Sequence, residues 1–287
     1  FRGRLIIPIR NAKGELCGFG SRSIDNSVPK YLNSSKTAIF DKGTILYGLN
    51  IAKKSARTDG LVIVEGYMDA IVAHQNQFTN VVASMGTALT LEQVSEVRKV
   101  TNKVVMALDP DVAGQQATLR SLASSWDVFQ KTAVTSRNKA RNENPLLFNR
   151  QEDLELKIAS LPDGLDPDEL IRRSSEEWTS LLTNAKPLFE YLLPALANQL
   201  DVSTPQGKSR IVEILFPFIA SISDPLQQDL YFQHLAKYLD IPEHTLKSNI
   251  HNFTAHNLRP SSTTYKGYHT SSQPARAHVD KPSNLPL

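Results

Sequence analysis

The sequence predicts an α/β fold: a parallel sheet flanked by helices, preceded by a small α+β basic segment and followed by a helical subdomain. Three observations support this prediction. Short apolar runs alternate with helical stretches in the middle of the chain, a pattern typical of βαβ units. Before them, apolar stretches alternate with turn signals, and after them apolar residues recur at helical intervals. With 287 residues and 40% hydrophobic content, the chain is long enough for about two domains.

The first 60 residues are the basic segment. They hold eleven Lys and Arg against four Asp and Glu, although the whole chain has a net charge of only +3. The stretches "RLIIPIR" and "ELCGFGSRSI" flank a turn at Gly14, so we expect a hairpin within residues 4–24. A basic segment beside an acidic remainder indicates a polyanion bound near a metal site. The alternative is a solvated charged face.

The middle of the chain, residues 61–172, is the predicted sheet domain. Thr90 and Gln93 have the spacing of a capping box, which predicts a helix start there. A polar, basic stretch at about 134–151 is expected to be an inserted loop. The predicted strands are 61–64, 81–84, 103–108 and 154–161.

The rest of the chain divides into a helical subdomain, 173–250, and a tail, 251–287. Pro205, Pro225 and Pro242 stand where helices are expected to begin. The tail is rich in Ser, Thr, His and Pro without periodicity, so we expect it to be disordered or a linker.

Composition excludes several classes of protein. The single cysteine, Cys17, rules out disulfides within the chain and argues against a cysteine-based zinc site, so a reducing cytoplasm is expected. No apolar run approaches the roughly 18 residues of a membrane span. The chain begins at Phe1 without a signal-peptide pattern, and we expect it to be a fragment of a longer protein. A P-loop motif is absent, which argues against a nucleotide motor of that kind.

Acidic residues follow three of the four predicted strands. In a parallel sheet the carboxyl ends of the strands lie at one edge, where open α/β sheets bind ligands. Each cluster could instead be a helix cap. A carboxylate such as Glu65 at the end of a buried strand is costly unless it is paired or binds metal, and converging acids suit Mg²⁺ or Mn²⁺. The clusters are Glu65 with Asp69, Asp109 with Asp111, and Asp163 with Asp166, Asp168 and Glu169.

Such a site fits phosphoryl transfer on a nucleic acid or nucleoside triphosphate, which leaves polymerase, nuclease and topoisomerase chemistry open. The stretch "EGYMD" (65–69) with the later Asp109-x-Asp111 resembles the Toprim signature. The similarity narrows to the bacterial DnaG-type replicative primases through four stretches. These are "PKYLNSSKTAIFDKGTILYGLNIAKK", "VEGYMDAI", "VASMGTALT" and "PDGLDPDELI".

The resemblance covers about residues 1–240 and implies DNA-templated synthesis of short RNA primers by two-metal-ion nucleotidyl transfer. It implies three partners: a single-stranded DNA template, ribonucleoside triphosphates and a replicative helicase. It implies no binding to a membrane. The catalytic carboxylates would be Glu65, Asp69, Asp109 and Asp111, with Glu65 taking the proton of the primer 3′-hydroxyl. The metal ligands would be Glu65, Asp109, Asp111, Asp166 and Asp168. Nucleotide and template would contact Arg22, Lys30, Tyr31, Asn33 and Lys42. Tyr31 could instead be an ordinary packed aromatic.

The chain departs from the family's pattern in several places. Pro110 replaces the small residue usual between the paired aspartates, and residues 134–151 look inserted. We expect the family's N-terminal module, with its zinc, to be missing from this chain, together with most of the first part of the polymerase core and the helicase-binding domain. The two rival hypotheses are a fragment of a Toprim topoisomerase and a non-catalytic nucleic-acid-binding fragment.

Overall fold

The structure is a computed structural model that describes residues 2–25, 28–86, 89–108, 126, 155–162, 164–220, 222 and 224–247. Phe1–Glu243 form one compact unit and His244–Leu287 a second. The expected insertion at 134–151 and the expected tail at 251–287 lie outside the described residues. So do Asp109, Pro110, Asp111 and Asp163.

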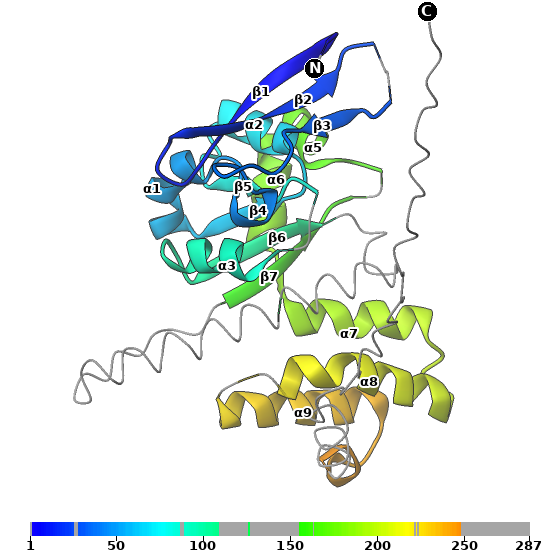
Figure 1. Cartoon of the computed structure of the whole chain (residues 1–287). Helices are drawn as coiled ribbons and strands as arrows, with labels where there is room; N and C mark the ends of the chain where they lie inside the picture. Colours follow the sequence, from blue (N-terminus) through cyan, green and yellow to red (C-terminus); the bar gives the residue numbers. More distant parts are fainter. Residues whose placement is uncertain are drawn as a thin grey trace, which may run out of the picture. The chain divides into compact units, whose positions relative to one another are not determined.

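A three-stranded antiparallel sheet opens the first unit (Figure 1). The predicted hairpin is confirmed, and its turn contains Gly14 with φ of 92°. A third, three-residue strand was not predicted, because so short a segment shows no alternation. Gly18 allows close packing, since a Cβ there would lie 2.5 Å from the ring of Phe40. The strands are β1 (Arg4–Arg10), β2 (Leu16–Ser23) and β3 (Tyr31–Asn33).

The central sheet has five strands in the order β5-β4-β6-β7-β8. The predicted strands are confirmed and run parallel, with register pairs such as Ile63 with Met106. The edge strand β8 is antiparallel and was not predicted, because a Lys-Pro pair carries no strand pattern; proline is tolerated at such an edge. The strands are β4 (Leu61–Val64), β5 (Val81–Ala83), β6 (Lys103–Leu108), β7 (Glu155–Ser160) and β8 (Lys186–Pro187).

Helices pack on this sheet because its strands are apolar on both faces; all of β4 is buried. The predicted cap at Thr90 is confirmed: its side chain accepts from the N–H of Gln93. The expected helix after Asp166 is divided in two at Ser174, whose hydroxyl accepts from the N–H of Glu177 and so starts a new helix. The helices are α1 (Leu49–Asp59), α2 (Tyr67–Gln75), α3 (Leu91–Arg98), α5 (Pro167–Arg173) and α6 (Ser175–Thr183).

Three further helices follow: α7 (Leu188–Gln199), α8 (Pro205–Ala220) and α9 (Pro225–Leu239). As predicted, Pro205 and Pro225 begin helices, where a missing N–H costs nothing. Leu192, Phe216 and Phe232 are buried in this region. In the described ranges, no helix combines the length and apolar character needed to cross a membrane.

The three-stranded sheet is held against the carboxyl edge of the central sheet. Ile7 and Ile9 of β1 share a buried cluster with Tyr67 at the start of α2 and Met85 after β5. The backbone of Tyr47 pairs with Ala83, the last residue of β5. This packing places the basic strands beside the strand ends where acidic residues are expected.

Candidate active site at the carboxyl edge of the sheet

The first acidic pair, Glu65 and Asp69, follows the end of β4. Gly66 is the N-cap of α2, and Asp69 occupies the third helical position, as the spacing predicted. The Asp69 carboxylate turns back and accepts a hydrogen bond from the N–H of Gly66 at 3.0 Å. Glycine is needed there, because a Cβ on Gly66 would lie 2.8 Å from that carboxylate oxygen.

The second acidic pair, Asp166 and Asp168, lies at the start of α5. Asp166 is the N-cap and Pro167 the first helical residue. Asp168 is buried, and its backbone N–H points to the Asp69 carboxylate at 3.4 Å. The first turns of α2 and α5 therefore meet, and two of the acidic clusters expected at this edge converge on one point.

Two of the expected ligands and one further acid of the clusters lie beyond the part of the chain that the structure describes. Asp109 and Asp111 follow directly after β6, and Asp163 follows β7, but all three lie outside the described residues. Among the side chains that the structure does describe, no group of three or more His, Cys, Asp or Glu residues is close enough to hold a metal ion by itself. The described part thus supplies the framework of an acidic edge and part of its side chains.

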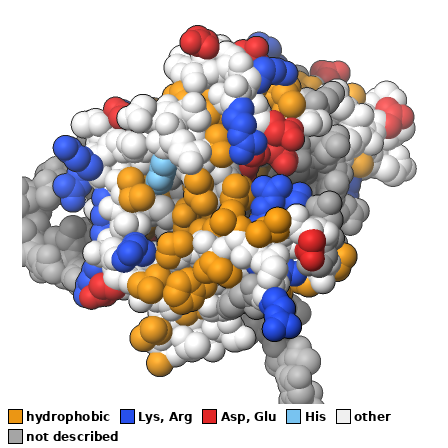
Figure 2. All heavy atoms as spheres, turned by 90° about the horizontal axis from the view of Figure 1, so that it is seen from above, with side chains coloured by type: hydrophobic (Ala, Val, Ile, Leu, Met, Phe, Trp, Pro, Cys, Tyr) orange, Lys and Arg blue, Asp and Glu red, His pale blue; other side chains and the backbone are white. Residues whose placement is uncertain are grey.

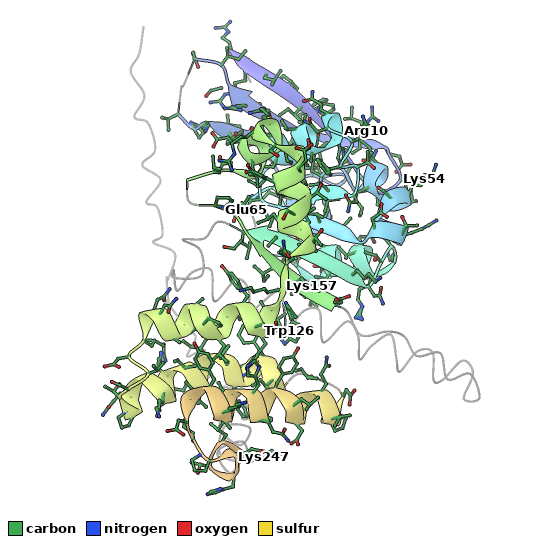
Figure 3. The ribbon with its side chains drawn as sticks, turned by 180° about the vertical axis from the view of Figure 1, so that it is seen from behind. Arg10, Lys54, Glu65, Trp126, Lys157 and Lys247 are labelled. Atoms are coloured by element: carbon green, nitrogen blue, oxygen red, sulfur yellow. The ribbon has the colours of Figure 1, made fainter. Side chains whose placement is uncertain are left out.

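The structure corrects the expectation that Glu65 is a costly charge at the end of a buried strand. Its side chain is exposed, although it follows a fully buried strand. Figure 3 shows Glu65 at the side of the central sheet away from Lys54. The cost of burying a charge therefore does not apply to Glu65. It applies to Asp69, whose carboxylate lies inside the first turn of α2.

The basic strands face this acidic edge. Arg22 of β2 and Lys30 lie over the ring of Tyr31, at 5.8 and 5.7 Å from its centroid. A cavity of about 430 Å³ joins the two sides. In Figure 2, Lys and Arg side chains adjoin Asp and Glu side chains on the face seen from above. Of the residues expected at the site, the cavity is lined by Arg22, Lys30, Tyr31, Asn33, Glu65, Asp69, Asp166 and Asp168.

Lys42 does not line this cavity with the other expected contacts. It belongs to a short 3-10 turn, η1 (Lys42–Thr44). The side chain of Gln93 donates hydrogen bonds to the backbone carbonyls of Lys42 and Ile45, at 3.1 and 3.0 Å. These bonds hold the turn against α3, outside the set of residues that line the cavity.

Burial and a neighbouring carboxylate change the protonation of Asp69. Burial, and then the charge of Asp168, raises the pKa of Asp69 from 3.8 to about 7. Burial also raises the pKa of Tyr31, with Asp69, Asp168 and Asp166 adding to the shift and Arg22 opposing it. The acids and the basic strand therefore share one electrostatic environment, and a cation at this edge would relieve the repulsion between the acids.

This pKa predicts how the metal-free chain responds to pH. Between pH 3.8 and about 7 the folded state binds more protons at Asp69 than the unfolded state does, so stability falls as pH rises through this window. Asp69→Asn should flatten that dependence, at a pH-independent cost of about 1 kcal/mol for a lost hydrogen bond. Thermal unfolding in EDTA between about pH 5 and 8 measures both effects. If stability changed with pH by the same slope in Asp69→Asn and in the unaltered chain, the raised pKa could not belong to Asp69.

Among the cavity-lining residues that sequence reasoning missed are Tyr67, Met85 and Arg172. Arg172 forms an ion pair with Asp168 at 2.7 Å, and their spacing of four residues on one helix could have revealed it. Met85 is buried with a positive φ of 60°, a rare conformation for this residue type that sequence does not signal. Tyr67 stood inside the quoted "EGYMD" stretch but had no assigned role.

Three family models match the chain. One is described as the N-terminal domain of the DNA primase catalytic core and matches residues 1–53, and one is described as a Toprim domain and matches 59–136. The third, described as the DnaB-helicase binding domain of primase, matches residues 189–244. This match overturns the expectation that the helicase-binding part is missing. That region consists of packed helices with few residues typical of a site, so composition alone did not distinguish it.

Similarity to known primases, in sequence and in structure, agrees with these family matches. A DNA primase of Clostridium acetobutylicum is 37% identical over 247 residues, which cover 86% of this chain and 37% of the relative. The chain thus spans well under half the length of that protein. The catalytic core of Escherichia coli primase is 32% identical with a TM-score of 0.66, covering 84% of this chain and 71% of the core. A DnaG primase catalytic domain bound to single-stranded DNA is 33% identical with a TM-score of 0.67, covering 83% and 70%.

Proposed function

Because this chain belongs to the DnaG-type family of bacterial DNA primases, we propose that it is the part of a primase that joins ribonucleotides on a single-stranded DNA template. One observation carries this proposal. A single cavity is lined by Arg22, Lys30 and Tyr31 on one side and by the carboxylates of α2 and α5 on the other. Polymerization needs both kinds of group at one place, because the substrates are polyanions and the transfer to phosphorus needs divalent ions.

The basic side is suited to bind template and nucleotide. Arg22 and Lys30 supply positive charge for phosphates, and the half-exposed ring of Tyr31 offers a face on which a base can stack. Asn33 also lines the cavity, and its side-chain amide oxygen is buried without a hydrogen-bond partner among the described residues. These four residues form the proposed binding surface.

The acidic side is suited to hold Mg²⁺ or Mn²⁺. Its donors are carboxylate oxygens, which such hard cations prefer. We assign the ion-binding role to Glu65, Asp166 and Asp168 together with Asp109 and Asp111. When bound, the ions stabilise the attacking and leaving oxygens of the transfer.

The chain's own groups then complete the reaction. The primer 3′-oxygen forms a bond to the α-phosphorus of the nucleotide, and the bond from that phosphorus to pyrophosphate breaks. Exposed Glu65 accepts the proton that the 3′-hydroxyl loses. Asp69, tied by hydrogen bonds to Gly66 and Asp168, holds the first turns of α2 and α5 together.

The organisation of the chain follows from the same proposal. We assign residues 1–60 to the basic subdomain, 61–172 to the Toprim domain and 173–250 to the helical subdomain. Residues 251–287 are assigned to a tail or linker. Within the helical part, residues 189–244 are the candidate contact for a replicative helicase.

Template-dependent incorporation of labelled ribonucleotides tests the proposal. The chain, given single-stranded DNA and Mg²⁺, should make short RNA products that disappear with EDTA or without template. DNA binding without synthesis, even when the other parts of a family primase are added, would favour a non-catalytic binding fragment instead. Covalent protein–DNA adducts would favour topoisomerase chemistry.

A further inference from the structure

Tyr67 connects the two sides of the cavity. It is the first residue of α2, between Gly66 and Met68, and therefore belongs to the acidic edge. Its side chain is 4% exposed, and its hydroxyl donates a hydrogen bond to the backbone carbonyl of Ser21 in β2 at 3.0 Å. One residue of the acidic edge thus reaches directly into the basic sheet.

The ring of Tyr67 extends this connection to the proposed substrate contacts. It packs edge to face against the ring of Tyr31, with 5.5 Å between the centroids. Arg22 and Lys30 lie over that Tyr31 ring. The position of Tyr67 therefore sets the position of the group that we propose to bind nucleotide and template.

The backbone of β2 is fitted closely to Tyr67. A Cβ on Gly20 would lie 3.0 Å from a ring carbon of Tyr67 and 3.2 Å from the side-chain oxygen of Asn33. Both are tighter than ordinary van der Waals contact, so a side chain at this position would require the Tyr67 ring or β2 to shift by a few tenths of an ångström. Burial raises the pKa of Tyr67 to about 12, so its hydroxyl remains protonated and able to donate.

We propose that Tyr67 is a positioning residue that fixes the spacing between the metal-binding carboxylates and the basic substrate-binding strands. The inference rests on the proposed function, because it assigns those two tasks to the two sides of the cavity. Each side can bind its own ligand separately, whereas joining a nucleotide to a primer requires both sides in register. Small errors in such alignment reduce turnover strongly.

Tyr67→Phe tests this directly, because it removes the hydroxyl and retains the ring. We expect turnover in ribonucleotide addition to fall about tenfold. The affinities for a single-stranded oligonucleotide and for Mn²⁺ alone should change less than about twofold, since neither ligand needs both sides. Gly20→Ala, which places a methyl group against the Tyr67 ring, should lower turnover in the same way. Tyr47→Phe is the matched control, because it removes a hydroxyl from the neighbouring ring, 6.0 Å from Tyr67; its turnover should equal that of the unaltered chain.

Hydrogen exchange of backbone amides tests the role of Tyr67 without requiring enzymatic activity. Backbone amides of β2 and β3 should exchange faster in Tyr67→Phe than in the unaltered chain, while those of α8 should not change. Unchanged turnover or unchanged exchange in Tyr67→Phe would overturn the inference, as would a parallel loss of Mn²⁺ affinity and unfolding temperature. If the unaltered chain adds no ribonucleotides even when the other parts of a family primase are added, the proposed function fails, and the exchange and Mn²⁺ results alone then decide the role of Tyr67.

Discussion

Replacing Asp168 by asparagine should lower Mg²⁺-dependent ribonucleotide addition by about 10²–10³-fold. Asp168 is a buried residue where the first turns of α2 and α5 meet, and its carboxylate pairs with Arg172 at the wall of the cavity. Asparagine has a similar shape but lacks the charge that holds a divalent ion. Steady-state rates of primer extension at saturating nucleotide measure the effect.

The same substitution should spare the fold. The charge of Asp168 raises the pKa of Asp69, which means that the two carboxylates repel each other in the metal-free chain. Removing one charge relieves this repulsion, and the Arg172 partner is half exposed and can be hydrated. Glu155→Gln is the matched control at the other end of the sheet, at the start of β7, and it should leave the rate unchanged. A sharp loss of thermal stability in Asp168→Asn would show that the carboxylate is structural.

Removing Arg22 and Lys30 together should weaken binding of single-stranded DNA and reduce its dependence on salt. Each phosphate contact contributes about 0.7 to the slope of log affinity against log salt for single strands, so two lost contacts should lower the slope by about 1.4. The basis is their common position over Tyr31 in the cavity. Fluorescence anisotropy at several salt concentrations gives the slope.

Two controls make this result specific. Lys54→Ala with Arg57→Ala removes the same two charges from exposed positions of α1 and should leave the slope unchanged. Lys42→Ala should have a smaller effect than Lys30→Ala, because η1 is held against α3 and does not line the cavity. Equal slopes in the Arg22–Lys30 pair and the α1 pair would mean that the charge of the whole segment attracts DNA and that the cavity has no special part.

The sequence predicted the helices and strands well where a local pattern marks the element or its first residue. The buried strand "LVIV", the cap at Thr90 and the proline helix starts each have a signal within a few residues, and the structure confirms them. The edge strand β8 and the short β3 were not predicted, because two or three residues cannot show a period.

The candidate site was predicted in its chemistry more than in its geometry. The acids after the strands and the basic strands come from composition and spacing, and the described members share one cavity, apart from Lys42. The contact from Tyr67 to Ser21 joins residues 46 apart, and no local pattern could show it. The burial of Asp69 also depends on packing between α2 and α5, so the sequence led us to Glu65 as the costly charge instead.

The central claim is that one cavity holds both the metal and the nucleotide. A crystal of this chain with Mn²⁺ and a non-hydrolysable ribonucleoside triphosphate, measured for anomalous scattering of manganese, tests it most directly. The account predicts manganese beside the carboxylates of Glu65 and Asp168, with the triphosphate extending toward Arg22 and Lys30. Manganese bound at another place, or a nucleotide bound away from Tyr31, would contradict the account.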